Sequence, residues 1–250
     1  MSALVTGASG GLGAAIAVSL AEGGRDIGVH FRGDAPGAAV TVGRVEAVGR
    51  RAVVLHADLD IEGAADLDLA CDGLLDRCAD GVGPPDVVVL NAFPQDLVAW
   101  VDLDTHAWDL MHRGGLRPTT ALLQRALARL EAGGVVVVVG SIEGLRPAPM
   151  HAPYAVAKAA LHHLTAAAAH EAGPHGIRVV GVAPGLIDRA GLREAWPSGV
   201  ARWESASALG RPVTLEEVAD TVRFLASPAA SGITGTTITI DAGWSAGPGW

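Results

Sequence analysis

The segment Thr6-Gly7-Ala8-Ser9-Gly10-Gly11-Leu12-Gly13 lies between the short apolar run Ala3–Val5 and a helix-like stretch over 12–23. Glycines at a strand-to-helix turn let the backbone approach a ligand closely, and the unpaired N–H groups at the start of the helix attract a phosphate. The segment therefore favours a dinucleotide site over a plain turn, which is the alternative that such a motif alone leaves open. The candidate ligand contacts are Gly7, Ser9, Gly10, Gly11, Leu12 and Gly13.

The rest of the chain repeats this alternation of an apolar run and a helix-like stretch. We expect strands at Ala3–Val5, Ile27–Phe31, Ala52–Leu55, Val87–Leu90, Val135–Val139, Val179–Ala183 and Thr236–Ile240. We expect helices at about 12–23, 35–49, 62–79, 104–131, 153–173 and 214–226. Because the runs are apolar throughout, they indicate a parallel sheet covered by helices on both faces. The sequence thus predicts one α/β domain over 1–250, a Rossmann-type doubly wound fold with a seven-stranded parallel sheet flanked by helices.

The composition narrows the classes of partner. Over 250 residues, 18 Lys and Arg stand against 27 Asp and Glu, which gives a net charge of −9. A negative chain without a basic run binds nucleic acid and anionic membrane surfaces poorly, so we expect neither as a partner. The apolar runs are too short to cross a bilayer, and no basic segment precedes the first strand as in a secretory signal. We therefore expect a cytoplasmic protein.

The spacing of cysteine and histidine predicts no metal site. Cys71 and Cys78 are seven residues apart within an expected helix, a spacing that fits neither a Cys-x-x-Cys site nor a disulfide framework and indicates buried thiols. The nine histidines show no His-Glu-x-x-His or comparable ligand spacing.

Only the segment 186–210 departs from the alternation, and we expect it to be irregular. It leaves the carboxyl end of an expected strand, where open α/β sheets bind ligands, so we interpret it as a lid over the site. Trp196 and Trp203 lie within it, and Trp250 ends the sequence. All three are expected to pack in a core or an interface, while the two in the lid also favour an apolar or aromatic substrate.

The end of the second expected strand indicates which dinucleotide would bind. An acidic side chain there would hold the 2′-hydroxyl of NAD, and a basic one would accommodate the 2′-phosphate of NADP. The sequence is His30-Phe31-Arg32, with Asp34 close behind. Arg32 therefore favours NADP(H), with a solvated loop arginine as the alternative.

A third set of residues can carry acid–base chemistry. Ser141 follows the fifth expected strand, and Tyr154 and Lys158 lie four residues apart on the next expected helix, hence on one helical face. They are the only tyrosine and the only lysine of the chain. We expect Tyr154 to exchange a proton with a carbonyl or alcohol, Lys158 to lower the pKa of that phenol, and Ser141 to orient the substrate oxygen. An ordinary surface pair of tyrosine and lysine is the alternative.

Together these motifs resemble the classical short-chain dehydrogenase/reductase family, and within it the beta-ketoacyl reductase type of bacterial ketoreductase. The resemblance covers essentially the whole chain and includes Asp58-Leu59, Asn91-Ala92 and Pro184-Gly185 after the third, fourth and sixth strands. It implies that Asp58 and Leu59 hold the adenine and that Lys158 also binds the nicotinamide ribose. From adenine to nicotinamide, the implied cofactor contacts are Asp58, Leu59, Asn91, Ala92, Tyr154, Lys158, Pro184, Gly185 and Ile187. It further implies homodimers or homotetramers built from the helices at 104–131 and 153–173, and we expect a homotetramer.

Two positions near the expected catalytic residues depart from the family pattern, and a third, Arg189, replaces the usual threonine after Pro-Gly-x-Ile-x, where we expect it to contact cofactor or substrate instead. Phe93 stands where the family has glycine after Asn-Ala, and it would crowd or reshape the floor of the site. Gly115, within His112-Arg113-Gly114-Gly115, falls where the family carries an asparagine that holds a water linked to the lysine. We expect the helix to kink or open at the two glycines. Our hypothesis is that water or a bulky substrate uses the vacated space, with substitution by His112 or an impaired proton relay as alternatives.

The expected function is the NADPH-dependent reduction of a ketone to a secondary alcohol. The abundance of Ala, Gly and Arg indicates a GC-rich genome, which extends the expectation to a bulky apolar or polyketide-type substrate. Two alternatives are an NADP-binding scaffold or regulator with little turnover, motivated by Phe93 and Gly115, and an NAD-dependent alcohol dehydrogenase. The intact set of Ser141, Tyr154 and Lys158 argues against the first. The lack of an acid at Phe31 argues against the second.

Overall fold

The computed structural model describes residues 1–247, so the expectation for Trp250 lies outside the described residues. One sheet contains seven strands in the order β3-β2-β1-β4-β5-β6-β7, and every neighbouring pair is parallel. The strands are β1 (Ser2–Val5), β2 (Asp26–Phe31), β3 (Ala52–His56), β4 (Val87–Leu90), β5 (Val135–Val139), β6 (Arg178–Pro184) and β7 (Thr237–Ile240). The expected doubly wound parallel sheet is confirmed.

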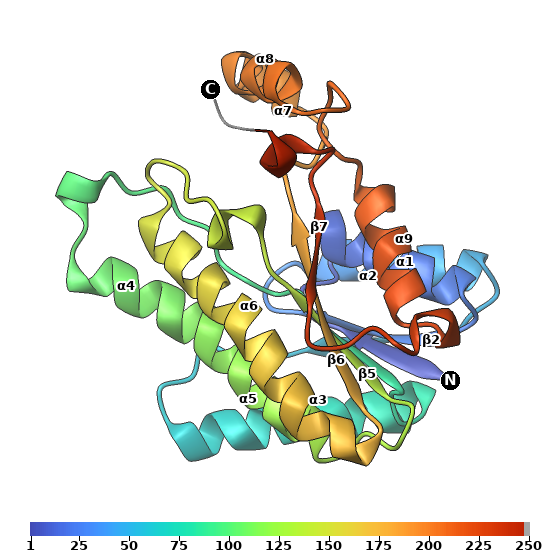
Figure 1. Cartoon of the computed structure of the whole chain (residues 1–250). Coiled ribbons are helices and arrows are strands. Elements are labelled where there is room, and N and C mark those ends of the chain that lie inside the picture. The colour runs from blue at the N-terminus through green and yellow to red at the C-terminus, as the bar shows by residue number, and fades with distance from the viewer. Residues whose placement is uncertain (248–250) are drawn as a thin grey trace.

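Helices cover both faces of the sheet (Figure 1). One face carries α1 (Gly11–Glu22), α2 (Ala35–Ala47) and α9 (Leu215–Leu225). The other carries α3 (Ala64–Val82), α5 (Arg117–Leu127) and α6 (Ala152–Ala172), with α4 (Thr105–Met111) leading toward α5. Two further helices, α7 (Leu192–Ala195) and α8 (Pro197–Ala206), stand above the carboxyl ends of the strands. Within residues 1–247, no helix has both the length and the apolar character needed to cross a membrane.

The central strands β1, β4 and β5 are largely apolar because each contributes to two cores. In β5, Val135, Val137 and Val139 pack in the core beneath α1, α2 and α9. Val136 and Val138, from the same strand, pack in the core beneath α3, α5 and α6. Successive side chains of a strand point to opposite faces, so a strand covered on both sides needs an apolar residue at every position.

The strand order changes direction between β1 and β4. From β1 the chain proceeds outward to β2 and β3 and then returns to β4 on the other side of β1. In open α/β sheets, the crevice at the carboxyl ends of the strands beside such a switch point is where ligands bind. The glycine-rich segment 6–13 leaves β1 at this edge, and Asn91 leaves β4 beside it.

The segment 186–210 contains the helices α7 and α8, so the expectation that it is irregular is wrong. α8 begins at Pro197, whose fixed φ suits the first turn of a helix. Gly199 is a poor helix former, but a Cβ there would overlap the ring of Trp196, so the glycine makes room for the tryptophan. Packing thus outweighs helix propensity at this position.

The helix expected over 104–131 is divided into α4, a π-helical turn at His112–Leu116, and α5. The turn contains Gly114 and Gly115, and the expected opening of the helix at these glycines is confirmed. π-turns are rare and occur often near functional sites. Thr119 Oγ1 donates a hydrogen bond of 2.8 Å to the carbonyl of Gly115, which gives this acceptor a partner within the widened turn.

Cys71 and Cys78 are free, buried thiols on α3, as expected. Burial raises the pKa of each thiol to about 12, so both are neutral near pH 7. Cys78 packs against β2 at Gly28, where a Cβ would lie 2.6 Å from the Cys78 sulfur and 2.9 Å from Leu55 Cδ1. The absent side chain at Gly28 therefore lets α3 approach the sheet.

The close approach at Gly28 gives a stability prediction. Gly28→Ala should lower the free energy of unfolding by about 1–3 kcal/mol, because the added methyl group overpacks this contact. Gly43→Ala is the control, since Gly43 is an exposed position of α2 where an added Cβ would meet nothing within 4 Å. Gly43→Ala should raise the free energy of unfolding by roughly 0.5–1 kcal/mol, because alanine has a higher helix propensity than glycine. Urea denaturation of both variants would contradict the assignment if Gly28→Ala were as stable as the wild type.

Candidate active site

His30 on β2 forms a hydrogen bond with the backbone of the glycine-rich segment. Gly7 has φ +63, and its N–H donates to Nδ1 of His30 at 3.2 Å. Because Nδ1 accepts, Nε2 carries the ring proton and lies 3.1 Å from the carbonyl oxygen of Ala57 as its donor. Burial lowers the pKa of His30 to about 4, which keeps the ring neutral and this tautomer intact. The sequence alone did not reveal this role, because no local pattern connects a strand histidine to a turn more than twenty residues away.

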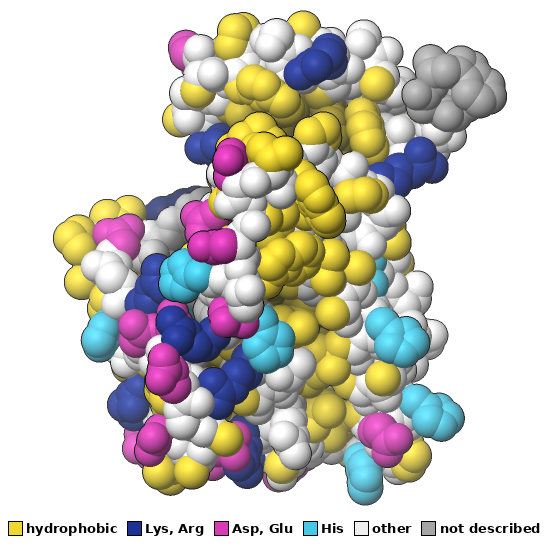
Figure 2. Space-filling view, turned by 90° about the vertical axis from the view of Figure 1, so that its left-hand side faces the viewer, with side chains coloured by type: hydrophobic (Ala, Val, Ile, Leu, Met, Phe, Trp, Pro, Cys, Tyr) yellow, Lys and Arg dark blue, Asp and Glu magenta, His cyan; other side chains and the backbone are white. Residues whose placement is uncertain are grey.

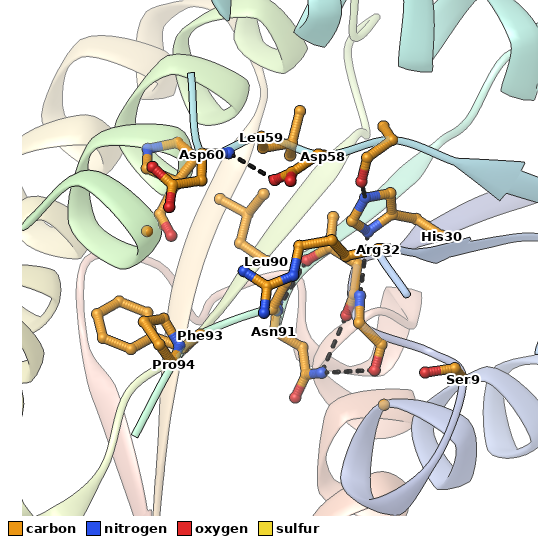
Figure 3. A pocket seen from close by; sticks show the side chains of 18 of the residues that line it. Ser9, His30, Arg32, Asp58, Leu59, Asp60, Leu90, Asn91, Phe93 and Pro94 are labelled. Carbon is orange, nitrogen blue, oxygen red and sulfur yellow. Dashed lines mark hydrogen bonds between the residues drawn. The ribbon is translucent and has the colours of Figure 1, made fainter. Parts of the chain in front are cut away.

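Thr6 and Asn91 connect the ends of β1 and β4. Thr6 Oγ1 accepts the backbone N–H groups of Asn91 at 2.8 Å and of Ala92 at 3.0 Å. In return, Asn91 Nδ2 donates to the carbonyl oxygens of Thr6 at 2.9 Å and Gly7 at 3.2 Å (Figure 3). The side chain of Asn91 therefore anchors the glycine-rich turn as well as lining the pocket described below.

The turn leaves a cradle that suits a phosphate. A Cβ at Gly13 would overlap the carbonyl oxygen of Gly7 and lie 2.7 Å from Asn91 Nδ2, so only glycine fits. α1 begins after Gly10 without a side-chain cap, which leaves its first N–H groups for a ligand. A Cβ added at Gly10 would meet only open space, which agrees with a free approach to this helix end.

A cavity of about 560 Å³ opens from this cradle along the carboxyl ends of the central strands. Ten of the predicted cofactor residues line it, namely Gly7, Ser9, Gly10, Leu12, Gly13, Arg32, Asp58, Leu59, Asn91 and Ala92. The remaining predicted residues lie outside its lining, namely Gly11, Ser141, Tyr154, Lys158, Pro184, Gly185 and Ile187. The pocket is thus the part of the site nearest to β1, β2 and β4.

Arg32 and Asp34 have different roles at the tip of β2. Arg32 is exposed, lines the pocket, and directs its guanidinium into it (Figure 3). Asp34 Oδ1 accepts the backbone N–H of Gly37 at 2.9 Å as the cap of α2. Both residues therefore line the pocket, and one carboxylate oxygen of Asp34 is engaged by the helix.

The loop after β3 is tied to the π-turn. Asp58 accepts the backbone N–H of Asp60 at 2.9 Å, and Asp60 pairs with Nε of Arg113 at 2.7 Å. Arg117 donates to the carbonyl oxygens of Ile61 at 2.6 Å and Glu62 at 2.7 Å. The pocket wall formed by Asp58 and Asp60 is thus fixed by arginines that flank the widened helical turn.

Ser141, Tyr154 and Lys158 lie together beyond β5. Ser141 caps a short helical turn, Ile142–Gly144, by accepting the backbone N–H of Glu143 at 3.1 Å. Tyr154 and Lys158 are one turn apart on α6, and the ammonium lies 5.4 Å from the centre of the phenol ring. Ser141 is 8% exposed and Lys158 2% exposed, so the set is largely shielded from water.

Phe93 occupies the space beside Lys158. The Lys158 ammonium donates to the carbonyl oxygen of Val139 at 2.8 Å and lies 3.9 Å from the centre of the Phe93 ring. A Cβ on Gly115 would lie 2.5 Å from Cζ of this ring. The hypothesis that water or a bulky substrate fills the space near Gly115 is therefore wrong, because the ring of Phe93 fills it. The two departures from the family pattern compensate each other sterically.

The pKa values in this set differ from the expectation that Lys158 moves Tyr154 toward neutrality. Burial raises the pKa of Tyr154 to about 12, with the Ser141 hydroxyl opposing the shift and the Glu143 carboxylate adding to it. Burial also lowers the pKa of Lys158 to about 7. A buried cation that is only half-charged near neutral pH stabilises a phenolate weakly. That expectation is corrected by this structure, in which Tyr154 keeps its proton.

The region that leaves β6 is covered by the aromatic residues of α8. A Cβ at Gly185 would lie 2.8 Å from Trp203, which stacks on Trp244 at 4.9 Å between ring centres. Trp203 thus packs as expected, whereas Trp196 is 45% exposed. The ends of the 186–210 segment meet, because Ile187 forms a parallel bridge with Val213.

Two acid–base residues near Tyr154 were not found from the sequence. Glu143 Oε2 lies 2.5 Å from Nδ1 of His151, and the His151 ring meets the Tyr154 ring edge-on at 6.2 Å. The spacing of these residues matches no motif, so only the folded chain brings them together. Within the described chain, no group of three or more His, Cys, Asp or Glu side chains is placed to hold a metal ion.

Comparison with known proteins identifies the family. The family model described as Enoyl-(Acyl carrier protein) reductase matches residues 7–245. The 1-cyclohexenylcarbonyl-CoA reductase of Streptomyces collinus is 34% identical over 248 residues, covering 97% of this chain and 86% of the relative. The chain belongs to the short-chain dehydrogenase/reductase family, and it is an NAD(P)-dependent oxidoreductase that acts on CH–OH or ketone groups.

Solved structures of ketoreductases share the fold. The promiscuous reductase LugOII, which catalyses keto-reduction at C1 during lugdunomycin biosynthesis, has a TM-score of 0.87 at 32% identity, covering 97% of each chain. The landomycin C-6 ketoreductase LanV, solved with NADP and rabelomycin, has a TM-score of 0.86 at 30% identity, covering 98% of this chain and 96% of that one. The resemblance to bacterial ketoreductases is confirmed.

The environment of Lys158 can be measured directly, because the chain has one lysine. In protein labelled with 13C at the lysine ε-carbon, the single NMR signal should titrate with a midpoint near 7. Phe93→Ala should raise this midpoint, because water reaches the ammonium. Phe93→Leu keeps the space closed but removes the π-face, so it should lower the midpoint further. A wild-type midpoint near the ordinary lysine value would contradict the buried environment.

Proposed function

We propose that this protein is an NADPH-dependent ketoreductase that reduces a ketone to a secondary alcohol. The observation that carries the proposal is the grouping of Ser141, Tyr154 and Lys158 beyond β5. Phe93 lines the cofactor pocket and lies against two of these residues. The centre of its ring is 5.8 Å from the centre of the Tyr154 ring and 3.9 Å from the Lys158 ammonium. Acid–base chemistry and the dinucleotide cradle therefore share one wall.

The charge at the tip of β2 supports NADP(H) as the cofactor. Arg32 faces the pocket and can pair with a 2′-phosphate, while Asp34, which also lines the pocket, has one carboxylate oxygen engaged in capping α2. The glycine-rich cradle would hold the pyrophosphate, Asp58 and Leu59 the adenine, and Pro184, Gly185 and Ile187 the nicotinamide end. LanV, which was solved with NADP, supports the same choice. When bound, the reduced nicotinamide supplies the hydride.

The proposed role of Tyr154 is that of the general acid. Its raised pKa keeps the phenol protonated at neutral pH, so the proton is available when negative charge develops on the substrate oxygen. An alkoxide is a much stronger base than a phenolate, so the transfer is downhill. Ser141 would hydrogen-bond the same oxygen and fix its position between the two hydroxyl groups. Lys158 would limit the cost of the phenolate that remains.

The surroundings of the site support a bulky apolar substrate. Several exposed apolar side chains lie on segments that follow the carboxyl ends of β4, β5 and β6, namely Leu97, Trp100, Val101, Leu145, Met150 and Trp196. The backbone N–H of Val98 donates to the carbonyl oxygen of Met150 at 3.0 Å and joins the segments after β4 and β5. We propose that the 186–210 segment is the lid that closes over such a substrate. The landomycin C-6 ketoreductase LanV, solved with bound rabelomycin, supports the proposal of a polyketide-type ketone.

Cofactor oxidation tests the proposal. NADPH should be oxidised in the presence of aryl or quinonoid polycyclic ketones, faster than NADH, and Tyr154→Phe should lower kcat by at least about 100-fold. Arg32→Ala should raise the KM for NADPH by roughly 10-fold or more, because one phosphate contact is lost. NADPH binding without turnover on any ketone would point to a scaffold or regulator. A preference for NADH would point to an NAD-dependent alcohol dehydrogenase.

We further propose that the protein assembles as a homotetramer. Figure 2 looks onto the side of the molecule that carries α4, α5 and α6, where hydrophobic side chains gather in a band beside charged ones. Val156, near the start of α6, is 57% exposed on its own chain and lies on one of these helices. The resemblance to the family implies the same helices as the interface.

Sedimentation of variants tests this assembly. The wild type should sediment as four chains of 25.3 kDa. Val156→Glu should give smaller species, because it places a charge on the exposed side of α6. Val40→Glu is the matched control, since Val40 is 65% exposed on α2, across the sheet from α6. A monomeric wild type, or an unchanged Val156→Glu variant, would contradict the proposed interface.

A further inference from the structure

Tyr154 must regain a proton after each proposed turnover, and its surroundings decide where that proton comes from. The titratable and charged groups around its ring are Lys158 on α6, Glu143 on the turn after β5, and His151 at the start of α6. Phe93, on the loop after β4, covers a further side of the Tyr154 ring, with 5.8 Å between the two ring centres. The proton can therefore arrive either past Lys158 or past the Glu143–His151 pair.

The path past Lys158 is closed in this structure. The Lys158 side chain is 2% exposed, donates to the carbonyl oxygen of Val139, and lies against the face of Phe93. The Phe93 ring in turn rests on Gly115, where a Cβ would lie 2.5 Å away. An apolar ring with no space behind it carries no proton, so Lys158 has no connection to solvent through this wall.

The path past Glu143 and His151 is open. Each side chain is 18% exposed, and Nδ1 of His151 lies 2.5 Å from Oε2 of Glu143. The backbone N–H of Glu143 donates to Ser141 Oγ at 3.1 Å, so the pair is built onto the proposed substrate-binding hydroxyl. The residue before His151, Met150, has φ +68, a strained value that sets the direction of the chain at this point.

Resting on the ketoreductase proposed above, we propose that the Glu143–His151 pair returns the proton to Tyr154 from solvent. Imidazole is the side chain best suited to exchange protons near neutral pH. A carboxylate on Nδ1 orients the ring, so that Nε2 is the nitrogen that exchanges protons toward the phenol and solvent.

The protons balance over one cycle. The substrate oxygen takes the phenol proton of Tyr154 as the C–H bond forms, which leaves a phenolate. The His151 imidazolium then gives its Nε2 proton to that phenolate, directly or through one water, and becomes neutral imidazole with Nδ1–H on Glu143. A proton from solvent restores the imidazolium. The net consumption is one proton from solvent for each ketone reduced.

Burst kinetics separate proton return from simple positioning. In His151→Ala, the first turnover should be as fast as in the wild type, because Tyr154 starts protonated. Later turnovers should be about 10- to 100-fold slower, most strongly at high pH. Stopped-flow oxidation of NADPH with a ketone substrate should therefore show a burst of one turnover per site, and added imidazole should restore the steady-state rate. His163→Gln is the control, because His163 is an exposed histidine on the same helix and should leave the kinetics unchanged.

Each outcome of that experiment is decisive. If the first turnover slows as much as the later ones and imidazole does not rescue the variant, the pair only shapes the site and the inference is overturned. Circular dichroism identifies a His151→Ala variant that fails to fold, in which case His151→Gln and Glu143→Gln take its place. If the wild type reduces no ketone, the proposed function fails. The coupling of the Glu143–His151 pair to Tyr154 is then tested by a measurement that needs no turnover.

That measurement uses the single tyrosine of the chain. Phenolate absorbance reports Tyr154 alone, without cofactor or substrate. In Glu143→Gln, its onset should move about one pH unit lower, because the carboxylate no longer opposes the phenolate. His163→Gln should leave the onset where it is. An unchanged onset in Glu143→Gln would mean that the pair is not coupled to Tyr154, and it would overturn the inference whatever the enzyme reduces.

Discussion

The hydrogen bonds between Thr6 and Asn91 are the interaction on which the site depends. The central strands β1 and β4 are paired neighbours in the sheet, and these hydrogen bonds continue their connection beyond the last strand pair, Val5 and Val89. Thr6 Oγ1 accepts two backbone N–H groups from the β4 side, and the Asn91 amide returns two hydrogen bonds to the β1 side. The phosphate cradle, the pocket and the loop that carries Phe93 all start from this connection.

The fold was predictable because its signals are local. A strand buried on both faces must be apolar at every residue, and such runs stand out in the sequence. The helices α7 and α8 were missed because both are short and Trp196, Pro197 and Gly199 interrupt the pattern, whereas in the fold Gly199, inside α8, makes room for the Trp196 ring. The π-turn was predicted only as a kink or opening of the helix. Two adjacent glycines indicate that a helix is locally less stable, but they do not specify which hydrogen-bond pattern replaces the α-helical one.

The site was predictable as far as its residues are neighbours along one element. Tyr154 and Lys158 are a single helical turn apart, and the glycine-rich segment is continuous. Phe93 and Gly115 come from different elements. Considered alone, Phe93 suggested an obstruction and Gly115 suggested a gap, but in the fold the Phe93 ring fills the space at Gly115. The pKa of Tyr154 was misjudged for the same reason, because the burial that raises it results from the assembled site and not from its lysine neighbour.

The burial of Lys158 has a practical consequence for handling the protein. It carries the only side-chain amine, and at 2% exposure this amine is shielded from reagents in solution. An amine-directed reagent would therefore leave this side chain unmodified while the protein is folded and would couple to it once the chain unfolds, so a dye attached at Lys158 marks unfolded protein.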